Sequence, residues 1–139
     1  EHQVLEEGVP ILGICVGMQM LANSSDEGDL PGLGWIEGRV RKFDISLMLG
    51  TKNLPHMGWN QVISRIESGL FNEMKGEKKF YFLHSYYFDC LQESNILGDT
   101  DYGFNFTSVI KKDNLFGVQF HPEKSHNFGV QLLKNFSDI

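Results

Sequence analysis

Cysteine is scarce in this 139-residue sequence, and no apolar run is long enough to cross a bilayer. Two cysteines, Cys15 and Cys90, cannot build a disulfide framework, and no charged-then-apolar signal segment precedes them. These features exclude a membrane protein and favour the reducing cytoplasm over secretion. We therefore expect a cytoplasmic protein.

Positive charge is also in short supply. The chain has 12 Lys and Arg against 18 Asp and Glu, a formal net charge of −6, so its long-range field repels nucleic acid and anionic membranes. Cys90 and His126 complete no metal-binding spacing, and the sequence has no glycine-rich phosphate loop followed by Lys and Ser or Thr. The sequence predicts no nucleic-acid or membrane partner, no metal and no cofactor.

The composition is that of one globular domain. Hydrophobic residues make up 41% and charged residues 22%, and no repeat, low-complexity tract or linker divides residues 1–139. Because helix-like sequence begins at once after Glu1, we expect the chain to start inside a larger domain.

Alternating hydrophobic and turn-forming segments predict an α/β fold with a mixed sheet. The expected elements are the end of a helix at 2–7, a buried strand at 9–14, a helix at 16–23, strands at 35–43, 57–63 and 79–90, a helical turn at 69–71, a hairpin pairing 106–110 with 115–120, and a helix at 125–137. Residues 24–34 form a polar, glycine-rich loop in this scheme, and another loop holds Pro55 and His56.

Residues 13–17, Gly-Ile-Cys-Val-Gly, have the pattern of a nucleophile elbow. In such a turn a strand ends, the nucleophile takes a strained conformation, and flanking glycines give the necessary clearance. The backbone N–H groups and the dipole of the following helix would favour a Cys15 thiolate and an oxyanion beside it. A buried core cysteine is the alternative, and for an isolated Cys it is the commoner case.

A cysteine nucleophile needs a base, and the base needs a group that holds its tautomer. The segment His121-Pro122-Glu123 offers both, because the proline can turn the imidazole and the carboxylate toward one side of the loop. Alone, this segment is typical of a surface histidine beside a solvated glutamate. Together with the elbow, it favours a catalytic pair.

Several further polar groups could bind a polar substrate. Gln19 lies one helical turn after Cys15, Glu27 lies in the following loop, and the segment His84-Ser85-Tyr86-Tyr87 interrupts an apolar strand. Each also has an ordinary explanation, as a solvent-facing amide, part of an acidic run or a core aromatic strand. Residues His56, Met57 and Trp59 around Gly58 are either a core edge or an interface anchor.

These motifs, taken in order, resemble the class I (triad-type) glutamine amidotransferases, whose signatures are Gly-x-Cys-x-Gly-x-Gln and a later His-Pro-Glu. The matching residues are 13–19 and 121–123. Residues 55–60, 81–87 and 114–125 are similar to those of the glutaminase subunits of imidazole glycerol phosphate synthase. The resemblance covers nearly the whole chain.

The resemblance implies a three-layer, flavodoxin-like fold and a glutaminase in which Cys15 attacks the glutamine amide, His121 shuttles the proton and Glu123 orients His121. It places the glutamine contacts at Val16, Gln19, Glu27, His84, Ser85 and Tyr86. It places Met57, Trp59 and Lys124 against a (β/α)8-barrel synthase/cyclase partner, to which ammonia passes to make imidazole glycerol phosphate and AICAR in histidine biosynthesis.

In that family a first strand, a helix and a glycine-rich oxyanion segment precede the elbow, and nothing before Glu1 corresponds to them. The resemblance therefore implies that the domain 1–139 is N-terminally incomplete. With one oxyanion donor at Val16 and the other absent, we expect this chain to be weakly active or inactive, since losing one such donor typically costs ~10²–10³ in rate.

Three alternatives stay open at this point. Residues 32–36 and 125–129 also resemble relatives that supply ammonia to amidotransferases making acetamidino or amino sugars of surface polysaccharides. The fold could instead serve as a non-catalytic docking module with a vestigial triad. A cysteine peptidase shares the Cys and His but does not explain Gln19 or the acidic loop.

Overall fold

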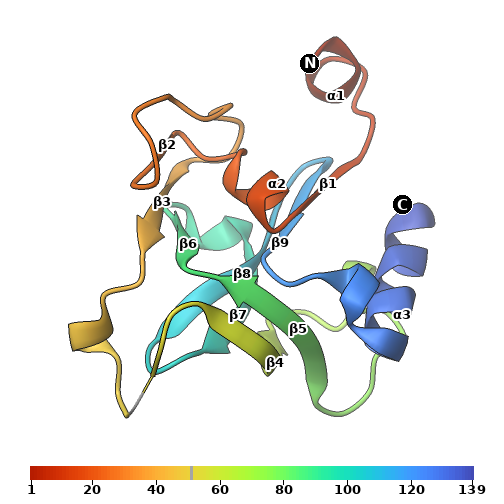
Figure 1. The fold of residues 1–139 in the computed structure, drawn as a ribbon. Coiled ribbons are helices and arrows are strands. Elements are labelled where there is room, and N and C mark those ends of the chain that lie inside the picture. The colour runs from red at the N-terminus through yellow and green to blue at the C-terminus, as the bar shows by residue number, and fades with distance from the viewer. Residues whose placement is uncertain (51) are drawn as a thin grey trace.

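The computed structural model describes residues 1–50 and 52–139. Figure 1 shows one body in which the long helix α3 lies at one side of the sheet strands. The helices and 3-10 turns are α1 (His2–Leu5), α2 (Val16–Gln19), η1 (Ile45–Leu47), η2 (Gly69–Phe71), η3 (Glu93–Asn95), η4 (Pro122–Lys124) and α3 (His126–Ser137). The strands are β1 (Ile11–Ile14), β2 (Ser24–Ser25), β3 (Gly38–Lys42), β4 (His56–Ser64), β5 (Lys78–His84), β6 (Tyr86–Cys90), β7 (Ile96–Asp101), β8 (Asn105–Lys112) and β9 (Leu115–Val118).

The main sheet has six strands in the order β1-β9-β8-β7-β4-β5, and a smaller sheet has the order β2-β3-β6. Strand β1 runs parallel to β9, with Leu12 opposite Phe116, whereas the other pairs of the main sheet are antiparallel. The predicted mixed α/β sheet is confirmed. The predicted hairpin is β8–β9, and its turn places Asp113 at a positive φ of 53°.

Two apolar clusters hold the layers together. One contains Phe80, Phe82, Phe116 and Phe120 of the sheet region and Leu132 of α3, all 3% exposed or less. The predicted helix stripe explains this contact, because Phe128, Leu132 and Phe136 recur at steps of four and face the same cluster.

The second cluster lies between α2, the small sheet and the β8–β9 hairpin. Met18, Val40, Phe88 and Ile110 are fully buried in it. Residues 109 and 110 on β8 belong to different clusters because successive strand side chains point to opposite faces. This packing fixes the start of α2, and hence Cys15, against the end of β1.

Three of the expectations differ from the structure. The helix expected at 16–23 is regular only over Val16–Gln19, because the chain turns at Met20 to Ala22 and buries Leu21. The strand expected at 79–90 is two strands that separate at Ser85, and they belong to different sheets. His56, expected in a loop, begins β4 and is 2% exposed.

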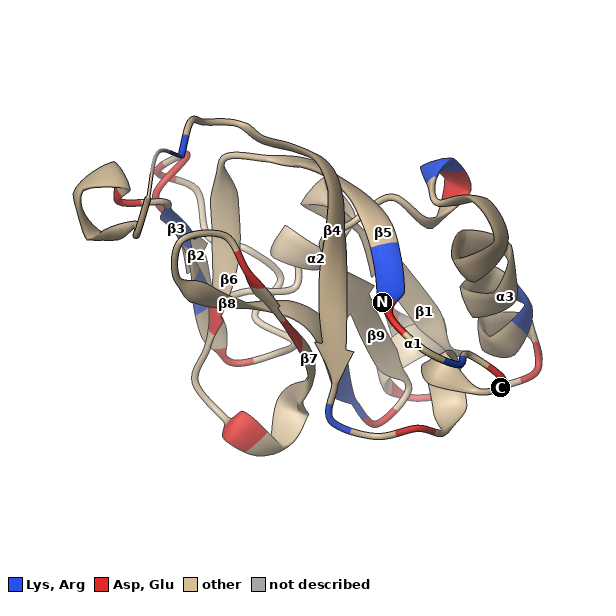
Figure 2. Cartoon of the chain, turned by 90° about the horizontal axis from the view of Figure 1, so that it is seen from below, with Lys and Arg blue, Asp and Glu red and all other residues tan. Residues whose placement is uncertain are grey.

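Charged residues of both signs are spread along the chain, in loops as well as in strands (Figure 2). They form exposed pairs such as Arg39 with Asp26 and Arg41 with Asp89. Among the helices described for residues 1–50 and 52–139, none is long and apolar enough to span a membrane.

Candidate active site

The turn between β1 and α2 has the geometry of a nucleophile elbow. Cys15 has φ 53° and ψ −110°, a conformation that L residues rarely adopt, and its N–H donates to the Val118 carbonyl at 2.8 Å. A Cβ atom at Gly13 would lie 2.6 Å from the backbone carbon and oxygen of Gly17, whereas a Cβ atom at Gly17 would meet nothing within 4 Å. The close approach of the strand end to the start of α2 therefore requires glycine at position 13 but not at position 17.

The Cys15 side chain is partly buried, and this burial raises the pKa of the thiol above its ordinary value. The Val16 backbone N–H and the Gln119 side chain lower the pKa, and the carboxylates of Glu123 and Glu27 raise it, but burial is the largest effect. The start of α2 thus favours the thiolate through the Val16 N–H, as expected, but burial of the sulfur has the larger and opposite effect on the pKa.

His121 and Glu123 form the expected pair. The Glu123 carboxylate accepts a hydrogen bond from Nδ1–H of His121 at 2.6 Å, which leaves Nε2 of the imidazole as the free, basic nitrogen. The loop that carries them is anchored by Ser125, whose hydroxyl accepts from the Tyr81 N–H at 3.0 Å and donates to the His121 carbonyl. Ser125 is 1% exposed, so these two hydrogen bonds are shielded from solvent.

The edge of β5 brings the cysteine and the histidine to one side of the sheet. The His121 N–H donates to the Tyr81 carbonyl at 2.9 Å, and the Cys15 thiol donates to the Leu83 carbonyl at 3.7 Å. Carbonyls two residues apart on a strand point the same way and are separated by about 7 Å. The His121 backbone and the Cys15 sulfur therefore contact the same edge of β5, two residues apart along the strand.

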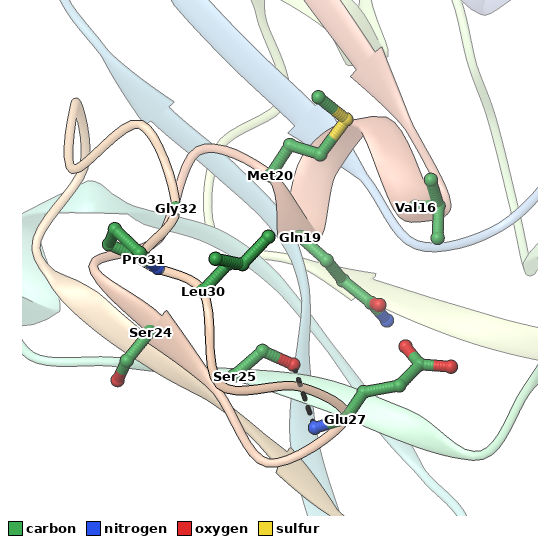
Figure 3. Close-up of a pocket in the computed structure, with 9 residues that line it drawn as sticks. All are labelled: Val16, Gln19, Met20, Ser24, Ser25, Glu27, Leu30, Pro31 and Gly32. Carbon is green, nitrogen blue, oxygen red and sulfur yellow. Dashed lines mark hydrogen bonds between the residues drawn. The ribbon is translucent and has the colours of Figure 1, made fainter.

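A cavity of about 170 Å³ opens beside the sulfur. It is lined by Cys15, Leu83 and the six residues expected to contact the substrate: Val16, Gln19, Glu27, His84, Ser85 and Tyr86. A second cavity of the same volume shares Val16, Gln19 and Glu27 with it and continues toward Leu30 and Pro31. Figure 3 shows the Gln19 amide and the Glu27 carboxylate pointing into one space from α2 and from the following loop.

His84 belongs to a buried hydrogen-bonded chain. Its Nδ1–H donates to the Tyr86 carbonyl at 2.8 Å, because a carbonyl only accepts, and its Nε2 accepts from Nδ1–H of His56 at 2.9 Å. Nε2 of His56 then accepts from the Asn60 amide at 3.1 Å. Both rings are neutral, since burial lowers the pKa of His56 to about 3 and that of His84 to about 4.

Residues 57 and 59 are on the outer face of β4. Met57 is 64% and Trp59 is 48% exposed, and the Trp59 ring stacks on His126 with the centroids 5.1 Å apart. His126 is the first residue of α3, two positions after the exposed Lys124. The three residues expected to face a partner therefore belong to neighbouring segments.

Sequence reasoning missed three site residues: Gln119, which contacts the sulfur, Ser125, which anchors the loop of His121, and Asn60, which ends the histidine chain. One signal was available for Gln119. It is a polar residue inside the apolar run 115–120, and buried polar groups require partners. Within residues 1–50 and 52–139, no group of three or more His, Cys, Asp or Glu side chains could hold a metal ion.

Comparisons with known proteins find similar sequences along the whole chain. The family model of glutamine amidotransferase class-I matches residues 1–138. The chain is 55% identical over 139 residues to the imidazole glycerol phosphate synthase subunit HisH of Bdellovibrio bacteriovorus, covering all of this chain and 68% of the relative. It is 47% identical over 136 residues to the protein of that name from Leptospira interrogans, covering 98% of this chain and 67% of the relative.

Solved structures share the fold at low sequence identity. The structure of PurLQS from Thermotoga maritima gives a TM-score of 0.69 at 17% identity, over 98% of this chain and 64% of the other. The glutaminase domain of CTPS from Trypanosoma brucei gives a TM-score of 0.61 at 18% identity, over 93% of this chain and 60% of the other. The chain thus spans about two thirds of its curated relatives. The family model matches residues 1–138, the HisH relatives match along the chain, and the solved structures share its fold. The chain therefore belongs to the class-I glutamine amidotransferase family.

Proposed function

We propose that this chain carries the glutaminase site of an imidazole glycerol phosphate synthase, where L-glutamine is hydrolysed to glutamate and ammonia through a thioester on Cys15. One observation carries the proposal. The Cys15 sulfur and the His121 N–H contact the Leu83 and Tyr81 carbonyls of β5, the His121 ring is paired with Glu123, and a cavity lined by Gln19, Glu27 and residues 84–86 opens beside the sulfur.

The first half of the reaction forms the thioester. Nε2 of His121 accepts the thiol proton as the Cys15 sulfur attacks the side-chain carbonyl carbon of glutamine, and Glu123 stabilises the imidazolium. The Val16 N–H, at the start of α2 beside Cys15, can donate to the developing oxyanion. The C–N bond then breaks, the imidazolium returns its proton to the leaving nitrogen, and ammonia departs.

The second half consumes the thioester. His121 takes a proton from water, the hydroxide oxygen attacks the thioester carbon, and the C–S bond breaks. The sulfur recovers the proton from His121, and glutamate leaves. Because burial raises the pKa of Cys15, the thiol must pass its proton to a base for the sulfur to attack, which is the role given to His121.

Charge in the cavity suits an amino-acid substrate. The Glu27 carboxylate complements the α-ammonium group of glutamine, while Gln19 offers its amide oxygen as an acceptor, since its amide hydrogens are bound to Tyr86 and Gln119. His84 is neutral and buried, and its ring is committed to Tyr86 and His56, so it shapes the wall rather than exchanging protons.

The partner in this proposal is a (β/α)8-barrel synthase/cyclase subunit that receives the ammonia. Support comes from relatives named imidazole glycerol phosphate synthase subunit HisH at 55% and 47% identity. Met57, Trp59 and Lys124 provide the docking face, since they are exposed, adjacent to the site and include an aromatic anchor.

A diazo-ketone analogue of glutamine tests the function directly. We expect one equivalent of label at Cys15, none at Cys90, and protection by free L-glutamine. Absence of labelling would support the docking-module alternative, and labelling indifferent to glutamine would support a peptidase. In the complex with the barrel protein, Cys15→Ala should abolish glutamine-dependent synthesis and preserve ammonia-dependent synthesis. Loss of both activities would contradict the proposed role of Cys15.

A further inference from the structure

Gln119 is a buried polar residue that the mechanism above does not use. It follows β9 directly, two residues before His121, and is 0% exposed. Its amide lies between two groups of the site: Gln19 on one side, at 3.0 Å, and the Cys15 sulfur on the other, at 3.6 Å.

The direction of each hydrogen bond follows from one carbonyl. The Tyr86 carbonyl can only accept, so the Gln19 atom 3.1 Å from it is Nε2. The same Nε2 supplies its second hydrogen to Gln119, which must therefore present Oε1 to Gln19. The other end of the Gln119 amide is then Nε2–H, and it faces the sulfur.

This orientation gives the sulfur an asymmetric environment. The resting thiol donates to the Leu83 carbonyl and accepts from Gln119. When the proton moves to His121, the Leu83 carbonyl becomes repulsive toward the negative sulfur, while the Gln119 N–H becomes a charge-assisted donor. The Gln119 contact thus strengthens as charge develops, which is the behaviour that catalysis requires.

We propose that Gln119 is a further catalytic residue of this site, a fixed N–H donor that holds the Cys15 sulfur and stabilises it as it becomes an attacking anion. Its role in turnover rests on the proposed glutaminase function, but its contact with the sulfur does not.

The buried histidine chain reinforces the orientation. The Tyr86 carbonyl accepts from Gln19 and from His84 together, and His84 is held in turn by His56 and Asn60. A rotation of the Gln119 amide would set its oxygen against the sulfur and its N–H against the Gln19 amide hydrogens. The amide is therefore held in one orientation before substrate arrives.

Titration of the thiol tests this proposal without turnover. The rate of Cys15 alkylation by iodoacetamide is measured from pH 6 to 11 by peptide mass, with Cys90 in each sample as the internal reference. Gln119→Glu keeps the acceptor for Gln19 but loses the donor to the sulfur, and Gln119→Met loses both. Asn135→Leu is the control, because Asn135 is 8% exposed and its amide donates to the carbonyls of residues 70 and 72, remote from the sulfur.

We expect Gln119→Met to move the Cys15 profile up by about half to one pH unit, which lowers its alkylation rate at pH 8 by roughly three- to tenfold. Gln119→Glu should move it further, and the Cys90 profile should stay fixed in both. Unchanged Cys15 profiles, or equal shifts at Cys90, would overturn the proposal. If neither variant folds by circular dichroism, Gln19→Met provides the test at a half-buried position, because it releases the Gln119 amide. An unshifted Cys15 profile in that variant would also overturn it.

Turnover gives the second readout. In the complex with the barrel protein, Gln119→Glu should lower kcat for glutamine hydrolysis at least tenfold with a smaller change in KM, and leave ammonia-dependent synthesis intact. A change confined to KM would contradict a catalytic role. Failure of the proposed function is recognised separately, because the wild-type protein would then show no glutamine-protected labelling while the thiol profiles still report on Gln119.

Discussion

Substituting Gly13 and Gly17 in turn tests whether the elbow needs glycine for the space around its Cβ position or for backbone flexibility. In Gly13→Ala, the new methyl group would lie 2.6 Å from the Gly17 carbonyl carbon and oxygen and 2.7 Å from the Met18 nitrogen. All three are backbone atoms, so the strand end and the start of α2 must separate by about 0.8 Å to reach ordinary contact. We expect unfolding to become easier by about 1–3 kcal/mol, the usual range for overpacking.

The displacement moves Cys15, which lies between the two glycines. A misplacement of about 1 Å can lower the rate of a reaction ~10²-fold, so we expect a loss of that order in glutamine hydrolysis and in labelling by the diazo-ketone. Gly17→Ala is the matched control, because its methyl group meets nothing within 4 Å and its backbone is helical. We expect that variant to retain labelling within about threefold and to gain up to about 1 kcal/mol from helix propensity.

The assays are urea unfolding and the second-order rate constant of Cys15 labelling, measured for the three proteins side by side. The reasoning fails if Gly13→Ala labels as fast as the wild type. It also fails if Gly17→Ala is equally impaired, because glycine would then be needed for a reason other than the space around its Cβ position.

Three further predictions concern the buried histidines, the loop anchor and the outer face of β4. Because His56 and His84 are neutral when folded, with pKa values of about 3 and 4, their protonation favours the unfolded chain; stability is full above pH 6.5 and falls toward pH 4. At pH 5 each should cost about 2 kcal/mol relative to pH 8, so urea midpoints should fall steeply, and a pH-independent midpoint would refute this. Ser125→Ala should loosen the loop of His121 and lower kcat for glutamine hydrolysis with little change in KM, and the loss should persist when kcat is expressed per folded molecule, with the folded fraction measured by circular dichroism. Trp59→Ala should weaken binding of the barrel protein by about 2 kcal/mol, roughly 30-fold in Kd by titration calorimetry, and an unchanged Kd would remove Trp59 from the interface.

Local patterns were sufficient for the elements whose structure depends on neighbouring residues. The hairpin follows from two apolar runs around residues 111–114, and α3 follows from Phe128, Leu132 and Phe136 at steps of four. The elbow was recognisable because a strained turn needs a specific short pattern. The residues of the candidate site were named from motifs, and the structure places the expected substrate contacts around one cavity.

Features set by distant segments were not predictable in this way. The break at Ser85 arises because β5 pairs with β4 while β6 pairs with β3. The polar residues at 84 and 85 interrupt the aromatic run, but local sequence does not say which strand each half pairs with. The raised pKa of Cys15 depends on burial, which the elbow motif does not encode. The role of Gln119 depends on Gln19, a hundred positions earlier in the chain.

The division at Ser85 has a mechanical consequence. Here the polypeptide leaves the six-stranded sheet and enters the three-stranded one, and the same few residues form a wall of the cavity beside the sulfur. The residues that join the two sheets therefore also form one boundary of the cavity, so the packing of the small sheet against the large one sets the width of that opening.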